Sequence, residues 1–159
     1  MHSELVRVKD SIIPAAASGI INAVSAYAAF RGEPAVALSV DSISSPDVTV
    51  WSRGASLAFT LGVFLSCVAA LKFRRTVARA HPDAAHLVNR PFFPFIVGLA
   101  LQNALSLFGM LVVVAVLWQR FVGTVTVGAP AATLLVGVLA FIVASTTETR
   151  TKRGMLTEP

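Results

Sequence analysis

Four apolar runs alternate with polar, mostly basic segments along this chain of 159 residues. The runs are residues 11–30, 54–71, 93–118 and 128–146. Each is close to or above the roughly 20 residues that an α-helix needs to cross a bilayer. Backbone polar groups inside a bilayer must be satisfied within the chain, which a helix achieves by itself. The pattern therefore predicts an all-α integral membrane protein, one membrane domain whose four transmembrane helices form a bundle.

The composition agrees with a membrane protein and argues against a soluble domain. Hydrophobic residues make up 55% of the chain and charged residues 13%, compared with about 25% charged residues in soluble domains. The net charge of +5 comes from cations that lie between and beside the apolar runs, not on a soluble basic face. We therefore expect no nucleic-acid partner. We expect the cations to orient the protein and to contact anionic lipid headgroups.

The basic loop of residues 72–90 separates the two halves of the chain and sets the predicted orientation. The amino end, this loop and the tail of residues 147–159 fall on one side of the four spans. That side holds every Lys and Arg except Arg31, Arg53 and Arg120. Because basic loops are retained in the cytoplasm, we expect a multi-pass protein of the cell membrane with both termini cytoplasmic. The polar tail is expected to fray.

The first apolar run permits a second interpretation. Basic residues precede it, and the sequence of residues 26–28, Ala-Tyr-Ala, fits the cleavage site of a secretory signal. Ser18, Asn22 and Ser25 would make a poor core for such a signal. We therefore expect a retained helix, with a cleaved signal as the alternative.

The predicted extracytoplasmic loops contain short β-like pieces. Residues 35–40 and 47–51 flank a turn-like sequence and predict a small hairpin. Residues 121–127 are also rich in β-branched side chains and could pair with this hairpin. Trp51 is expected near the headgroups, where an amphipathic indole is stabilised.

The two halves of the chain resemble each other. The matches are residues 22–25 with 103–106 (N-A-x-S), 54–56 with 128–130, and 60–63 with 133–138 after one residue of slippage. They predict two repeated helical hairpins in the same orientation, related by an axis along the membrane normal. Chance similarity between Ala-rich helices is the alternative.

Small side chains recur every four residues along the second run, and they are Ala58, Gly62, Ser66 and Ala70. We call this set the small-residue stripe. It allows another helix backbone to approach closely, and close packing drives helix association in lipid. The neighbour is either another helix of the same chain or a helix of a second protein.

Two asparagines interrupt the apolar runs, and each is followed three residues later by a serine. They are Asn22 with Ser25 and Asn103 with Ser106. An amide in hydrocarbon needs a partner, so both amides are expected to face the bundle interior. They form either an interhelical hydrogen bond or the polar lining of a pathway.

Several kinds of chemistry have no support in the sequence. The middle of each predicted span lacks titratable side chains, so no proton relay or gating charge is expected. His81, Asp83 and His86 are interrupted by Pro82 and are expected to form a solvated loop, not a metal site. Cys67 is the single cysteine and has no thiol partner. No nucleophile–base or phosphate-binding motif is present, so we expect neither an enzyme nor a cofactor.

Two functions remain open. The first is an accessory or scaffolding subunit, without catalytic chemistry, that packs its small-residue faces against other membrane proteins. The second is a homo-oligomeric channel or facilitator for a small solute or ion. In that case Asn22, Ser25, Asn103 and Ser106 line the path, and an oligomer is required because four helices rarely leave a pore. We favour the first function.

Overall fold

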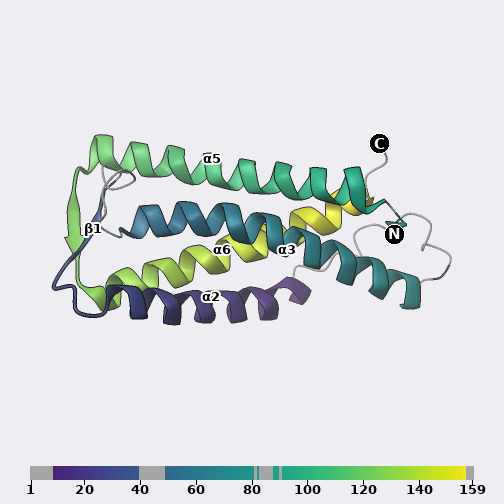
Figure 1. The fold of residues 1–159 in the computed structure, drawn as a ribbon, viewed down its shortest axis with the longest axis horizontal. Coiled ribbons are helices and arrows are strands. Elements are labelled where there is room, and N and C mark those ends of the chain that lie inside the picture. The colour runs from purple at the N-terminus through teal and green to yellow at the C-terminus, as the bar shows by residue number, and fades with distance from the viewer. Residues whose placement is uncertain (1–8, 40–48, 81, 83–87, 90, 157–159) are drawn as a thin grey trace.

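The structure is a computed structural model, and it describes residues 9–39, 49–80, 82, 88–89 and 91–156. Its long helices are α2 (Lys9–Phe30), α3 (Val50–Ala80), α5 (Val97–Phe121) and α6 (Ala129–Leu156) (Figure 1). A short helical element, η3 (Phe92–Ile96), precedes α5 and is interrupted by extended backbone at Phe93. Four helical segments are long and apolar enough to cross a membrane. The prediction of a multi-pass helical membrane protein is confirmed at this level.

The order of the helices in space differs from their order in the chain. Successive helices run in opposite directions (Figure 1). Helix α6 packs along α2 and α3, and α3 also packs along α5. Helices α2 and α3, although consecutive, make few contacts. We call the end where α3 and α6 finish the basic end, and the end with the two strands the strand end.

Small residues allow the helix backbones to approach closely at two crossings. A Cβ atom added to Gly62 on α3 would lie 2.7 Å from the Cα atom of Ala104 on α5. A Cβ atom added to Gly137 on α6 would lie 3.0 Å from the Cβ atom of Ala23 on α2. The whole small-residue stripe of α3 is buried within the chain. Its close approach therefore serves packing inside the bundle.

Two short strands close the strand end. Strand β1 (Val36–Leu38) pairs antiparallel with β2 (Val125–Val127), with Ala37 opposite Thr126. The segment after α2 thus pairs with the segment after α5. The predicted hairpin inside the first loop is wrong at its second strand, because Val50 and Trp51 begin helix α3. Residues 40–48, which hold the rest of that hairpin, lie outside the described part of the chain.

A capping box explains why α3 begins earlier than predicted. The backbone N–H of Ser52 donates to Oγ1 of Thr49 at 3.2 Å. The N–H of Thr49 donates in turn to Oγ of Ser52 at 3.1 Å. This reciprocal pair satisfies two donors that a helix start otherwise leaves free. It fixes the first turn of α3 ahead of the apolar run.

Helices α3 and α6 also continue past the ends of their apolar runs. The predicted basic loop of residues 72–90 is helical through Ala80, and the predicted frayed tail is helical through Leu156. Phe73 and Val77 of α3 are buried in one cluster with Met155 of α6, and Leu156, Val88 and Ile96 belong to the same cluster. A helix persists where one face is buried, even when its other face is polar. The boundaries drawn from the apolar runs were therefore too short.

Candidate functional site

Helix α6 places four polar side chains inside the basic end of the bundle. Thr147, Glu148, Thr151 and Lys152 are each at most 9% exposed. They form two pairs with a spacing of four residues, which places them on neighbouring strips of one helix side. We call these residues and their partners on the other helices the polar layer. Sequence reasoning assigned them to a polar tail, although their four-residue spacing was a usable signal.

Asn103 joins three helices in the polar layer. Its Nδ2 donates to Oγ of Ser66 at 3.2 Å and to Oγ1 of Thr151 at 3.1 Å. The three side chains come from α5, α3 and α6, and all are buried. Ser66 also belongs to the small-residue stripe, so one face of α3 provides both close packing and a hydrogen-bond partner. Such hydrogen bonds stabilise helix association by about 0.6–2 kcal/mol each.

Asn22 lies in a different environment from Asn103. Its Nδ2 donates to the carbonyl oxygen of Ser18 at 2.8 Å, one turn earlier on the same helix. The structure therefore does not join the two amides. Ser25 and Ser106, the serines that follow these asparagines, also have different neighbours. Nη2 of Arg53 lies 3.5 Å from Oγ of Ser25, and Nη1 of Arg150 donates to Oγ of Ser106 at 2.9 Å.

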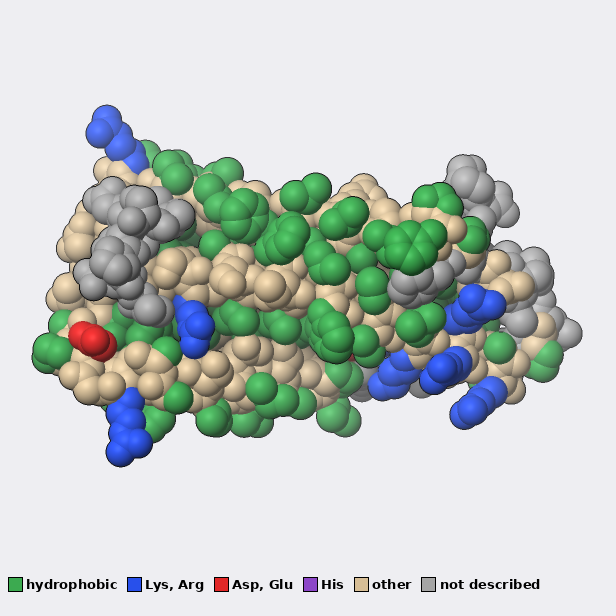
Figure 2. All heavy atoms as spheres, viewed as in Figure 1, with side chains coloured by type: hydrophobic (Ala, Val, Ile, Leu, Met, Phe, Trp, Pro, Cys, Tyr) green, Lys and Arg blue, Asp and Glu red, His purple; other side chains and the backbone are tan. Residues whose placement is uncertain are grey.

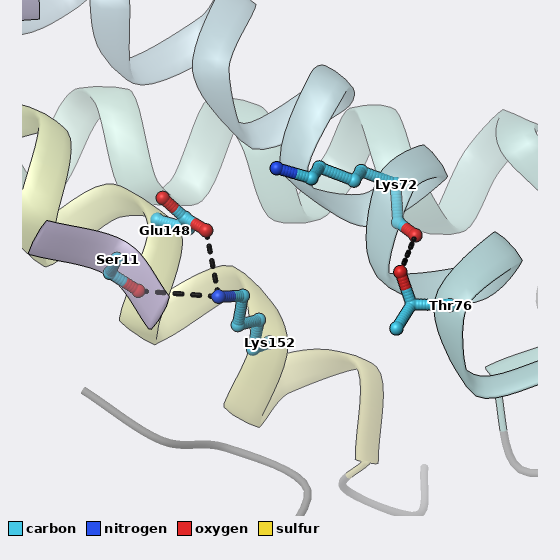
Figure 3. Close-up of polar contacts among 5 residues, drawn as sticks. All are labelled: Ser11, Lys72, Thr76, Glu148 and Lys152. Carbon is cyan, nitrogen blue, oxygen red and sulfur yellow. Dashed lines mark hydrogen bonds and ion pairs between the residues drawn. The ribbon is translucent and has the colours of Figure 1, made fainter. Parts of the chain in front are cut away.

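A buried ion pair ties the start of α2 to α6. The Nζ atom of Lys152 lies 2.7 Å from Oε1 of Glu148 and donates to Oγ of Ser11 at 3.3 Å (Figure 3). Both charged side chains are about one-tenth exposed. Charges removed from water must be paired to be tolerated. Glu148 also lines a cavity of about 90 Å³ together with Lys72 of α3, whose side chain Figure 3 shows beside the pair.

A larger hollow lies between α5 and α6 at the basic end, and we call it the α5–α6 groove. Its volume is about 730 Å³. The lining residues are Pro94, Phe95, Gly98, Leu99, Gln102, Asn103, Ser106, Arg150, Arg153 and Gly154. The groove thus combines two guanidinium groups, three uncharged polar side chains and an apolar portion. Sequence reasoning missed it because its sides come from α5 and from the tail that was expected to fray.

The described residues contain no group of three His, Cys, Asp or Glu side chains placed to hold a metal ion. The His81, Asp83 and His86 cluster lies outside the described part of the chain. A comparison of the chain with known proteins found no matching family model, no matching curated protein and no matching solved structure. The geometry of the polar layer, the groove and the exposed helix faces is therefore the basis for assigning a function.

Proposed function

We propose that the protein is a non-catalytic accessory or scaffolding subunit that binds a transmembrane helix of another membrane protein. The binding surface is the outer face of α5, which consists of Gly98, Gln102, Leu105 and Gly109. These residues lie opposite the buried side of α5, which includes Ala100, Ala104, Leu107 and Leu111. The outer face is therefore available to a partner.

The observation that carries this proposal is the state of Gln102. Its side chain is exposed on a long apolar helix, and in the described part of the chain it makes no hydrogen bond. An amide facing hydrocarbon is unfavourable, and a polar group on a neighbouring helix would satisfy it. Nothing lies within 4 Å of a Cβ atom added to Gly98 or Gly109. These glycines leave room for a second backbone beside the unpaired amide.

The sequence suggested the small-residue stripe of α3 as a docking surface, and we propose α5 instead. The small-residue stripe of α3 is buried against helices of the same chain. It supports the bundle and leaves no open face for a partner. The α5 outer face, like the stripe, combines small residues with a polar side chain, and it lies on the exposed side of its helix.

The placement of the amides favours docking over conduction through one chain. The Asn103 amide nitrogen donates to Ser66 and Thr151 on two other helices. Asn22 bonds to its own helix. A channel that uses both amides would need an oligomer that brings their separate sides together. Such an oligomer is an outcome of the experiment below.

We also propose that the chain consists of two related hairpins, and two equivalent contacts support this. Ala23 and Ala104 occupy the same place in the two N-A-x-S matches. Each packs against a glycine in the second helix of the other half, Gly137 for Ala23 and Gly62 for Ala104.

The buried faces of α2 and α5 follow the same relationship. When the two helices are aligned so that Asn22 matches Asn103, buried residues of the first half match buried residues of the second. The pairs are Ala15 with Ile96, Gly19 with Ala100, Ala26 with Leu107, and Phe30 with Leu111. In this arrangement each half packs its first helix on the second helix of the other half, so that the two hairpins interlock.

The basic end is proposed to face the cytoplasm of the cell. Figure 2 shows a group of Lys and Arg side chains at the end of the bundle where α3 finishes. The described cations on this end of α3 and α6 are Lys72, Arg74, Arg75, Arg79, Arg150, Lys152 and Arg153. Retention of basic segments in the cytoplasm is the physical basis of this orientation.

The docking proposal is tested by native mass spectrometry of the full-length protein extracted gently from its own membranes. We expect a stoichiometric complex with a larger membrane protein. Gly109→Leu should release the partner because it fills the space on the α5 outer face. The matched control, Ala17→Leu on the exposed side of α2, should retain it. A discrete homo-oligomer without a partner would contradict the scaffold and favour the channel.

A further inference from the structure

Arg150 places a positive charge on α6 beside α5, six residues before the helix ends. Its Nη1 donates to Oγ of Ser106 at 2.9 Å, and Ser106 lies three residues beyond Asn103 toward the strand end. Asn103 is level with Ser66, to which it is hydrogen-bonded. The Arg150 guanidinium therefore reaches the level of Asn103 and Ser106, within the apolar run of α5.

No carboxylate of the described side chains neutralises this guanidinium. Glu148 is paired with Lys152, and Glu33 lies at the strand end, after α2. Arg153, one turn nearer the basic end, also has no carboxylate partner among the described residues. A cation at membrane depth normally faces an anion or water. Within the described part of the chain, the two guanidinium groups of the groove therefore lack an anionic partner.

The α5–α6 groove has the size and the chemistry of a binding site. Its volume of about 730 Å³ falls within the roughly 300–1,000 Å³ that is usual for small-molecule sites. Arg150 and Arg153 are three residues apart on α6, so their side chains lie on one side of the helix. Guanidinium groups match phosphate oxygens with paired hydrogen bonds. Phe95 and Leu99 supply an apolar wall beside these cations.

We propose that the α5–α6 groove binds the phosphate group of an anionic lipid, held by Arg150 and Arg153, with the acyl chain against Phe95 and Leu99. A lipid fits better than an acidic protein segment because the groove joins cations to apolar wall on a helix pair that faces the bilayer. Arg153 and then Arg150 lie along α6 from the basic end toward the strand end. A headgroup therefore enters the groove from the basic end. The groove shares Gly98 and Gln102 with the proposed helix-docking face, whereas Gly109, the position that tests that face, does not line the groove.

The test measures lipid binding to the full-length protein in detergent by native mass spectrometry. Phosphatidylglycerol and phosphatidylcholine are added separately, since only the first carries a net negative charge. The variant is Arg150→Gln with Arg153→Gln, and the matched control is Arg75→Gln with Arg79→Gln. The control removes the same charge from the same end of the bundle, at exposed positions outside the groove.

We expect the wild type and the control to bind phosphatidylglycerol about tenfold more tightly than phosphatidylcholine, and the groove variant to lose this preference. Should the double variant fail to fold, Arg153→Gln alone serves, because the Arg153 side chain is exposed and makes no hydrogen bond or ion pair within the described part of the chain. An equal loss in variant and control would overturn the proposal, because it would show general attraction to the basic end.

Competition with inorganic phosphate distinguishes the two sources of the anion. Phosphatidylglycerol that resists displacement by phosphate assigns the groove to a lipid, because the acyl chain adds to the binding. Full displacement would overturn the lipid assignment in favour of a free phosphate group. The groove variant releasing a bound protein, with lipid binding unchanged, would overturn it in favour of an acidic protein segment. None of these results depends on whether Gly109→Leu releases a helix partner.

Discussion

Gly62 on α3 and Ala104 on α5 lie in backbone contact: a Cβ atom added to Gly62 would approach the Ala104 Cα atom to 2.7 Å and its Cβ atom to 3.0 Å. Lipid is as apolar as the helix surfaces, so burial alone does not drive their association. Dispersion contacts between closely approaching backbones supply this attraction instead. The stability of the bundle should therefore depend on side-chain volume at this crossing.

We predict that Gly62→Ala lowers the free energy of unfolding. The new methyl group meets backbone atoms that cannot move aside without shifting α5, and overpacking of this kind costs about 1–3 kcal/mol. Reversible unfolding in mixed detergent micelles measures the change. Gly98→Ala is the control, because its Cβ atom meets nothing within 4 Å. Equal behaviour of the two variants would contradict the close crossing.

The two asparagines should differ in their contribution to stability. Asn103→Ala removes hydrogen bonds to Ser66 and Thr151 on two other helices, and we expect a loss of about 1–2 kcal/mol. Asn22→Ala removes only a bond within its own helix and should change stability by a few tenths of a kcal/mol. The same unfolding measurement compares them. Equal losses would indicate that Asn22 has an interhelical partner.

Lys152→Met should destabilise the protein strongly because it leaves the Glu148 carboxylate without its buried partner. Breaking a buried ion pair from one side costs roughly 3–5 kcal/mol. Adding Glu148→Gln should recover part of the loss, and a double-mutant cycle measures the coupling. Additive effects of the two substitutions would show that the pair makes no net contribution.

The packing of the first helix on the last predicts a specific cross-link. In a Cys67→Ser background, Ala23→Cys with Gly137→Cys should form an intrachain disulfide, because the relevant Cβ atoms would lie about 3 Å apart before relaxation. Mobility on a non-reducing gel reports the bond. Ala17→Cys with Gly109→Cys, on two outward faces, should not cross-link. Loss of about 28 residues from the mature chain would instead reveal the cleaved signal.

The orientation proposal predicts labelling from opposite sides of the membrane. In the same Cys67→Ser background, Thr124→Cys at the strand end should react with a membrane-impermeant maleimide in intact cells. Arg79→Cys at the basic end should react only after permeabilisation. Both residues are exposed in the bundle, so burial does not limit either reaction. The reverse pattern would place the basic end outside the cell.

The four helices were predictable because length and apolarity are local properties of the sequence. Each span requires only an unbroken apolar run, and the structure has a helix at each one. The small-residue stripe was also visible, since Ala58, Gly62, Ser66 and Ala70 share one face by their spacing alone. Its neighbour was not visible. Which helix packs against that face depends on contacts between residues far apart in the chain.

The candidate site was largely hidden because its residues resemble a solvated tail. Glu148, Thr151 and Lys152 lower the average hydropathy of the last segment, which ends the predicted span too early. Their burial follows from the direction of one face of α6 toward Ser11, Ser66 and Asn103. Asn103 was identified as a buried amide, but its partners could not be. Only one of them, Ser66, had been singled out, and for its size.

The pairing of α2 with α6 has a consequence for biogenesis. The first helix enters the membrane long before its main neighbour exists, because Gly137 follows Gly19 by 118 residues. At the usual rate of ~5–20 residues per second, the ribosome needs roughly 6–24 s to supply the missing helix. During this interval Gly19 and Ala23 face lipid or an insertion factor. A stop codon between α2 and α6 would leave the nascent chain inserted but unassembled, and such a fragment is a natural substrate for membrane quality-control proteases.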